Sequence, residues 1–254
     1  VVILTEDLSR PCTLVARRLP PPPARFRRAV RTPISAAVTY LNVAAFVLLL
    51  RAPRAFSALT KDDVLIRGGQ VHRMVSSCFL HGGIVHLGLN MQALRTLGPE
   101  VEEWFGHERF AGVYLLSGVS GNALSLATRT APLSVGASGA IFGLLGAWYS
   151  FLQQNQQFFE SRGVDVSRSL KGMLQTCALN AVLGLSPHSR VDNWCHVGGF
   201  LGGAGCSVIF GPRLRQVRGF VVDEPLLRLP SLQDKISRHR RRRRRQRPLS
   251  PFLG

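Results

Sequence analysis

The sequence predicts an all-α polytopic membrane protein with six transmembrane helices, and three observations favour this fold class. First, the chain is 46% hydrophobic and only 18% charged. Second, its uncharged stretches recur at the length that a bilayer requires of a helix, which is about 20 mostly apolar residues. Third, the positive charges gather at the two ends of the chain and in the gaps between these stretches. A length of 254 residues suits one compact membrane domain.

Six windows of the sequence contain no Asp, Glu, Lys or Arg. Several of them are rich in Gly, Ala and Ser, which suit tightly packed helices in lipid. The alternative is a soluble helical protein with a buried core. It is disfavoured because six such windows, with the charges confined to the gaps, are hard to obtain otherwise. The windows are Thr32–Leu50, Met74–Leu94, Phe110–Thr128, Thr130–Phe159, Gly172–Ser189 and Asn193–Pro212.

The net charge of +18 belongs to the ends of the chain. Residues 1–31 carry a net charge of +5 and residues 212–254 carry +10, whereas the 180 residues between them carry +3. This distribution excludes a uniformly basic nucleic-acid-binding domain, and the apolar middle excludes wholesale disorder. We therefore expect a flexible basic arm at 1–31, a six-helix membrane domain at 32–211 and a largely disordered basic tail at 212–254.

Six spans would place both termini on one side of the membrane. That side then carries 25 Lys and Arg residues, against 7 on the opposite side. By the positive-inside rule, we expect both termini on the cytosolic side or on its organellar equivalent, a stroma or matrix. The run Arg240–Arg245 has no aromatic residues between its arginines on which bases could stack. We expect it to contact anionic lipid head groups rather than nucleic acid.

The cysteines and the start of the chain give weaker indications. The five cysteines form no CxxC pair and lie mostly inside the uncharged windows, so they predict small apolar packing residues, with no disulfide framework and no zinc site. The first 31 residues are Arg-rich and acid-poor, which is typical of the remnant of an organellar presequence. The cysteines are Cys12, Cys78, Cys177, Cys195 and Cys206.

Polar side chains inside three of the windows are candidates for function because such groups are costly in lipid. The second, fourth and sixth windows run in the same direction across the membrane. With a rise of 1.5 Å per residue, their polar groups lie about 5–15 Å below one membrane face. We expect them to converge there. The four converging candidates are Ser138 in the fourth window, His196 in the sixth, and His86 and Asn90 in the second, which also contains His81.

Serine and histidine together suggest nucleophilic catalysis. A serine hydroxyl is a weak nucleophile until a base takes its proton, and histidine suits that task. Ser138 and His196 would form a two-residue pair without an acidic third member. Asp192, the only nearby carboxylate, precedes the predicted helix and favours a helix cap. Attack on a carbonyl creates an oxyanion, which the side chains of His86 and Asn90, one helical turn apart, could stabilise with the Ser138 backbone N–H.

Glycines near these residues have both a functional and a structural interpretation. Gly199 and Gly203, four residues apart after His196, would let the sixth helix press against the fourth. Gly136 and Gly139 flank Ser138 and allow close backbone approach. Such small residues also occur in plain helix packing, where a serine is usually structural, and a lone buried histidine is usually a packed one. The agreement in depth and direction is what favours catalysis.

The chain resembles the rhomboid family of intramembrane serine proteases across about 180 residues. Three motifs carry the resemblance in order and spacing: His81-x4-His86-x3-Asn90, then Gly136-Ala137-Ser138-Gly139 followed by Phe142, then His196-x2-Gly199-x3-Gly203. The resemblance implies a six-helix bundle with a partly membrane-embedded first loop, which cleaves transmembrane segments of other proteins without a metal or cofactor.

By the same resemblance, each matched residue has an expected role. Ser138 is the expected nucleophile and His196 the general base. His86 and Asn90 occupy oxyanion-stabilising positions. Phe142 stands where an aromatic ring packs against the base, and His81 stands where the family has a chiefly structural histidine.

Two positions depart from the family pattern. In Gln70-Val71-His72-Arg73, His72 replaces an aromatic residue, which puts the rigidity of the first loop in question. Cys195 stands before the base, where a smaller residue is common. The run Ser134–Gly143 and the triplet Asp192–Trp194 look most like plant and algal plastid rhomboids. The resemblance thus implies a plastid inner envelope, with the mitochondrial inner membrane second.

Two functions remain in competition on sequence alone. One is an intramembrane serine endopeptidase that uses Ser138 and His196. The other is a catalytically inactive rhomboid-like protein that binds or escorts membrane clients. Such relatives usually lack the serine or the histidine, and this chain keeps both.

Overall fold

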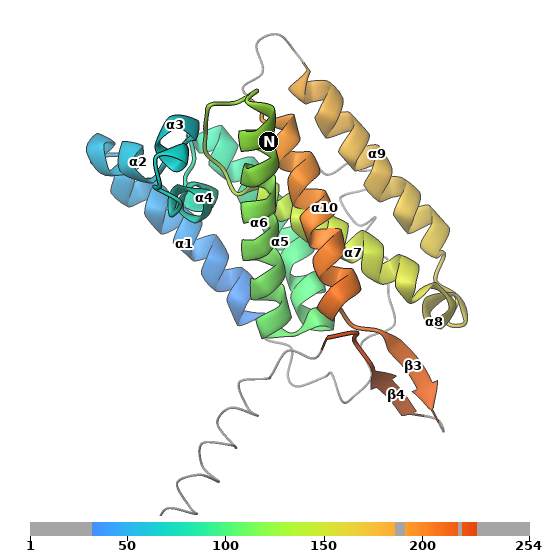
Figure 1. Cartoon of the computed structure of the whole chain (residues 1–254). Helices are drawn as coiled ribbons and strands as arrows, with labels where there is room; N and C mark the ends of the chain where they lie inside the picture. The colour runs from blue at the N-terminus through green and yellow to red at the C-terminus, as the bar shows by residue number, and fades with distance from the viewer. Residues whose placement is uncertain (1–31, 186–190, 218–219, 228–254) are drawn as a thin grey trace, which may run out of the picture.

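The computed structural model describes residues 32–185, 191–217 and 220–227 of the chain. Within these ranges the protein is mostly helical, and Figure 1 shows the long helices gathered into one bundle. The long helices are α1 (Pro33–Leu49), α5 (Ile84–Phe105), α6 (His107–Thr128), α7 (Ser138–Gln154), α9 (Val166–Gly184) and α10 (Asn193–Phe210).

The remaining elements are short and join the long helices. Between α1 and α5 lie α2 (Pro53–Leu59), strand β1 (Lys61–Asp62), α3 (Asp63–Arg67), α4 (Arg73–Ser76) and the 3-10 turn η1 (Ser77–Phe79). Strand β2 (Leu133–Ser134) precedes α7, and α8 (Gln156–Glu160) follows it. After α10 come strands β3 (Leu214–Val217) and β4 (Phe220–Asp223).

Each uncharged window overlaps one long helix, but the helices differ in how readily they would cross a membrane. By length and composition, α6 is the one helix of the described residues that is long and apolar enough to span a bilayer, and α1 is a shorter apolar helix of 17 residues. The expectation of a helical fold is confirmed in that the described residues are mostly helical, although they also form two short antiparallel strand pairs, β1–β2 and β3–β4. The count of six spans stays a prediction.

The second window, Met74–Leu94, was placed wrongly. Its helix begins at Ile84 rather than at Met74, and it continues to Phe105, beyond the predicted end. Residues 73–79 instead form α4 and η1. The absence of charge marks lipid exposure, whereas backbone hydrogen bonds and the break at Gly82-Gly83 set the start of the helix. His81 therefore lies before α5 and not inside a span.

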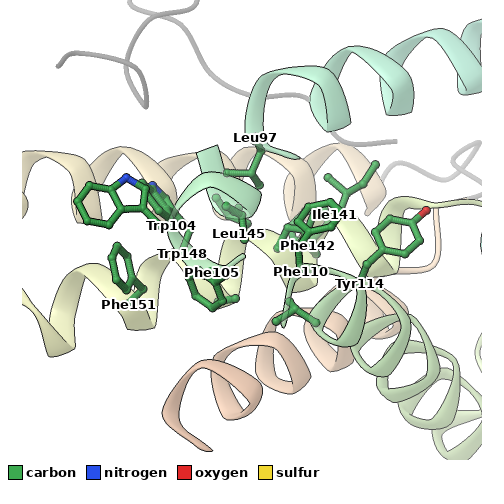
Figure 2. Packing of buried hydrophobic residues seen from close by; sticks show 14 of the residues in the cluster. Leu97, Trp104, Phe105, Phe110, Tyr114, Ile141, Phe142, Leu145, Trp148 and Phe151 are labelled. Carbon is green, nitrogen blue, oxygen red and sulfur yellow. The ribbon is translucent and has the colours of Figure 1, made fainter. Parts of the chain in front are cut away.

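Helix α7 occupies the centre of the bundle, where it contacts α5, α6, α9 and α10. Most of its residues are buried, in keeping with a sequence that is apolar on every face. Figure 2 shows one end of the core, where Phe151 of α7 packs against two tryptophan rings. The ring centroid of Phe151 lies 5.5 Å from that of Trp104 and 5.2 Å from that of Trp148.

Glycines bring α10 into backbone contact with α7. A Cβ added at Gly199 would overlap the carbonyl oxygen of Gly139, and one added at Gly203 would overlap that of Gly143. On α7, a Cβ at Gly146 would overlap the carbonyl oxygen of Phe200. The prediction that Gly199 and Gly203 press the last helix against the serine helix is confirmed.

Arg73 organises the first loop between α1 and α5. Its side chain is buried, and its Nη1 donates to the carbonyl oxygens of Ser57 and Thr60, each at 2.7 Å. Its Nε donates to Oε1 of Gln70 at 2.8 Å. The exposed His72 makes only a long contact of 3.4 Å from Nε2 to the Ala58 oxygen. The arginine and glutamine of the motif therefore hold the loop without an aromatic residue at position 72.

Part of the predicted tail at 212–254 is folded, and the rest of that prediction, from residue 228 on, lies outside the described residues. Strands β3 and β4 pair as an antiparallel hairpin in the register Leu214↔Asp223. The hairpin is tied to the bundle because Asp223 forms an ion pair of 2.7 Å with Arg109 of α6. The basic arm 1–31 and the run Arg240–Arg245 lie outside the described residues.

Candidate active site

The structure brings Ser138 and His196 into direct contact. Ser138 is the first residue of α7, and His196 lies in the first turn of α10. Oγ of Ser138 lies 2.9 Å from Nε2 of His196, although 58 residues separate them in the sequence. Both are buried, with exposed fractions of 8% and 4%. This is the hydrogen bond that a serine nucleophile and its base require.

The loop before Ser138 is held by the first loop. Strand β2 pairs with β1 in the register Lys61↔Ser134, and the Gly136 N–H donates to the Ser77 oxygen at 3.0 Å. Gly136 has a φ of 142°, and a Cβ there would lie 2.9 Å from the His86 ring. Only glycine combines this backbone angle with such close approach to the ring. The chain can therefore turn into α7 with Ser138 at its first position.

Three contacts hold the His196 ring and the turn that carries it. The ring of Phe142, one turn after Ser138 on α7, stacks on His196 with centroids 4.2 Å apart and planes 14° apart. Asp192 Oδ1 accepts the Cys195 N–H at 3.0 Å, which confirms the predicted helix cap. Asp192 Oδ2 accepts a short hydrogen bond from the buried Ser125 hydroxyl of α6. The start of α10 is thereby tied to α6 and α7.

His86 and Asn90 differ in how they lie relative to Ser138. His86 lines the cavity at Ser138, with its ring beside Gly136. Asn90 is fully buried and does not line that cavity, and its Nδ2 donates to the His86 carbonyl oxygen at 2.8 Å. His81 is buried with its ring centroid 5.1 Å from that of His86. The structure thus places one of the two predicted oxyanion-binding side chains at the cavity.

The position of Ser138 at a helix start supplies a feature that the sequence did not reveal. The first N–H groups of an α-helix have no acceptor within the helix and lie at the positive end of its dipole. The sequence predicted a span that opens at Thr130, eight residues before the observed first residue of α7. Because α7 begins at Ser138, its own N–H is such a group. Gly136, two residues before the start of α7, was a signal in the sequence for this helix boundary.

Two cavities meet at this pair. The larger, of about 560 Å³, is bordered by the first loop, the 133–136 loop and the starts of α5 and α10. A second cavity, of about 350 Å³, lies between α7, α9 and α10 and is mostly apolar. Ser138 lines the first cavity and His196 lines the second. A polypeptide in the larger cavity could therefore reach the serine hydroxyl.

The fold and the site define a helical protein with a serine–histidine pair inside its bundle. Comparison with known families agrees: residues 68–213 match the Rhomboid domain model. The chain belongs to the rhomboid family and is therefore an integral membrane protein with a helical, polytopic fold. The matched range contains Ser138, His196, His86 and Asn90.

Three relatives show the range of the family that this chain resembles. It is 36% identical over 178 residues to RHOMBOID-like protein 5 of Arabidopsis thaliana, covering 69% of this chain and 55% of the relative. It is 34% identical over 157 residues to RHOMBOID-like protein 9, chloroplastic, of the same plant, covering 61% and 34%. It is 37% identical over 150 residues to Rhomboid protease GluP of Bacillus subtilis, covering 59% and 27%. The chain thus spans about half or less of these proteins.

Proposed function

We propose that the protein is an intramembrane serine endopeptidase that cleaves transmembrane segments of other proteins. The observation that carries the proposal is the 2.9 Å hydrogen bond between Ser138 Oγ and His196 Nε2 inside the bundle. Family membership alone allows either a protease or a rhomboid-like protein without activity. A buried nucleophile already bonded to its base, beside a cavity, favours the protease.

The reaction would proceed by acyl transfer. His196 Nε2 takes the Ser138 proton as Oγ attacks the carbonyl carbon of the peptide bond, and the carbonyl oxygen becomes an oxyanion. His196 then gives that proton to the leaving amine nitrogen, and the C–N bond breaks to leave an acyl ester on Ser138. A water molecule, deprotonated by the same histidine, hydrolyses the ester and restores the serine.

Two groups beside Ser138 would stabilise the oxyanion. The Ser138 N–H at the start of α7 is a donor with no acceptor in its own helix. The His86 ring lines the same cavity. Asn90 stays a predicted donor, and to serve it would have to exchange its bond to the His86 carbonyl for one to the oxyanion. His86 and the helix start therefore have the better-supported roles.

The substrates follow from the position of the site within the membrane domain. A helical segment hides its own carbonyl groups in hydrogen bonds, so it must unwind locally before Ser138 can reach one. We expect transmembrane proteins to enter sideways from the lipid and to be cut near small, helix-destabilising residues. The domain that does this is proposed as residues 32–211, with the basic arm at 1–31 and the basic segment at 212–254 on the cytosol-equivalent side, where the run Arg240–Arg245 would contact anionic lipids.

The compartment is a further proposal. The relatives include one named chloroplastic and one named mitochondrial, so their names do not decide between the two organelles. We place this protein in the plastid inner envelope because the run Ser134–Gly143 and the triplet Asp192–Trp194 resemble plastid rhomboids. A mitochondrial inner membrane is the second candidate. Import of the tagged full-length protein into isolated chloroplasts and mitochondria, followed by membrane fractionation, would distinguish the two.

Cleavage by purified variants tests the proposed activity. In liposomes that contain a reporter with one transmembrane segment, S138A and H196A should each lose cleavage. The matched control is S150A, which removes another buried serine hydroxyl from the same helix and should keep it. Cleavage that survives S138A would refute the dyad.

A fluorophosphonate probe separates the protease from the inactive alternative. It should label the wild type at Ser138 and leave S138A unlabelled, because only an activated serine reacts. An intact wild type that remains unlabelled and does not cleave would favour a protein that binds membrane clients.

A further inference from the structure

Two buried polar atoms at the second cavity lack hydrogen-bond partners. The cavity has a volume of about 350 Å³ and is lined by His196 and Asn193 together with mostly apolar residues. Across the described parts of the chain, neither Nδ1 of His196 nor Oδ1 of Asn193 has a partner. The two side chains stand three residues apart on α10, so they share one face of the helix. One atom can donate and the other can accept.

The proposed reaction requires one particular tautomer of His196. To take the serine proton, Nε2 must be unprotonated and accept from the Ser138 hydroxyl, which lies 2.9 Å away, so the reactive neutral ring carries its proton on Nδ1. In that tautomer Nδ1–H is a buried donor that no described residue accepts from. A buried donor without an acceptor is unfavourable, which would shift the ring towards the tautomer that cannot take the serine proton.

The amide of Asn193 is held so that its oxygen is the free end. Its Nδ2 donates to the carbonyl oxygen of Ala181 on α9 at 3.2 Å, and a carbonyl can only accept, so this contact identifies the nitrogen. Gly184 of α9 provides the space, because a Cβ there would overlap the Asn193 amide. Figure 1 shows the C-terminal end of α9 beside the start of α10. Oδ1 of Asn193 is thus a fixed acceptor.

We propose that Asn193 is a positioning residue for His196, and that its Oδ1 accepts the Nδ1 proton through one bridging water. The two atoms lie beyond direct hydrogen-bond distance, and the cavity has room for a water with a donor on one side and an acceptor on the other. The bridge does for His196 what the carboxylate does in a serine–histidine–aspartate triad. The inference rests on the function proposed above.

The same amide connects the base to α9. Asn193 bonds to Ala181 with its nitrogen and serves His196 with its oxygen. A displacement of this end of α9 would therefore move the acceptor and change the tautomer of His196.

The test uses the full chain in detergent micelles, labelled with 15N in its seven histidines. The His196 signals are those that disappear in H196A. Asn193→Leu removes the acceptor at similar volume, and Asn193→Asp is the matched control that keeps an oxygen acceptor but loses the donor to Ala181. The tautomer is read from the ring 15N shifts, and kcat and KM are read from reporter cleavage.

We expect the wild type to carry the proton on Nδ1 and N193D to keep it there. N193L should move the proton towards Nε2 and lower kcat by about 10- to 100-fold with little change in KM, because a mispositioned base loses part of its usual contribution of about 10²–10⁴. Melting temperatures check that each variant is folded.

A His196 tautomer that is unchanged in folded N193L would overturn the proposal, whatever the rate does. Equal tautomer shifts in N193L and N193D would also overturn it, since they would assign the effect to the Ala181 bond. If N193L does not fold, the wild-type spectrum decides instead: a His196 proton on Nε2 would overturn the proposal, and one on Nδ1 would support it. Cleavage that survives S138A would instead refute the proposed function, and the 15N result does not depend on cleavage.

Discussion

The carboxylate of Glu102, near the end of α5, accepts a hydrogen bond from the backbone N–H of Ser35 at 2.7 Å and so caps the start of α1. The same carboxylate accepts the Ile34 N–H at 3.0 Å and contacts His107 Nδ1 at 2.6 Å. The first N–H groups of α1 lack acceptors within the helix, and a carboxylate is a strong acceptor at the positive end of its dipole. Glu102 therefore fixes α1 to the bundle.

Replacing Glu102 should loosen α1. E102A leaves the buried Ser35 N–H and the partly buried Ile34 N–H without an acceptor. A buried N–H without an acceptor costs about 1–3 kcal/mol and a partly buried one less, so the melting temperature in detergent should fall clearly. E102Q keeps one acceptor oxygen and should lose less. Thermal unfolding followed by intrinsic fluorescence measures both, and an E102A melting temperature equal to that of the wild type would contradict the capping role.

A methyl group at Gly203 should separate α10 from α7. The added Cβ would overlap the Gly143 carbonyl oxygen, which is rigid backbone, so G203A should lose at least the roughly 1–3 kcal/mol typical of overpacking. The cleavage rate of G203A should also fall, because separating α10 from α7 moves His196 away from Ser138.

The control for G203A is G205A on the same helix, where nothing lies within 4 Å of an added Cβ. It should match the wild type in melting temperature and in cleavage. If the two variants behave alike, the close approach of the helices has no energetic weight.

Lys61 should be needed to hold the loop that precedes Ser138. Its fully buried Nζ forms an ion pair of 2.7 Å with Asp63 and donates to the Ala131 oxygen at 2.6 Å. K61M leaves the Asp63 carboxylate buried without its cation, which typically costs about 3–5 kcal/mol. Unfolding in detergent would show the loss.

The double variant K61M/D63L tests whether that loss comes from the unpaired charge. Removing both ions should recover most of the stability, since an apolar pair is often as good as a buried ion pair. Cleavage should recover only in part, because the bond to Ala131 is still missing. A double variant as unstable as K61M would show that Asp63 is not the cause.

The ring at position 142 should influence the rate through His196. F142Y keeps the stacked ring and should cleave at close to the wild-type rate, whereas F142L loses the stack. An aromatic pair contributes about 0.5–1.5 kcal/mol beyond its burial, so F142L should lower kcat by about 2- to 10-fold. Reporter cleavage measures kcat, and the rate of fluorophosphonate labelling checks the reactivity of Ser138 itself. Equal cleavage rates in F142L and F142Y would remove the ring from the mechanism.

Much of this protein could be predicted from the sequence because its signals are local. The uncharged windows indicated the long helices, since charge is costly in lipid, and the expected topology placed Ser138 and His196 at a similar depth on helices that run in one direction. Glycines four residues apart predicted the close packing of α10 on α7. The cap at Asp192 followed from its position before a helix.

The tertiary structure decided what depends on partners distant in the sequence. The second helix starts at Ile84, because backbone bonding and not charge sets a helix end, and this places His81 outside it. Residues 214–217 pair with 220–223, and Arg109, more than a hundred residues earlier in the chain, binds Asp223 and ties this pair of strands to the bundle. The side chain of Asn90 donates to the His86 carbonyl oxygen of its own helix, and that of Asn193 donates to the Ala181 carbonyl oxygen of α9.

The sequence by itself thus determined the class of protein and the two residues of the candidate dyad, because residue type and spacing encode both. It could not show that Ser138 begins a helix, that Glu102 caps another, or that His196 and Asn193 each keep an atom without a partner. Those facts arise only when separate segments pack, since burial and hydrogen bonding are properties of pairs that the linear order does not reveal.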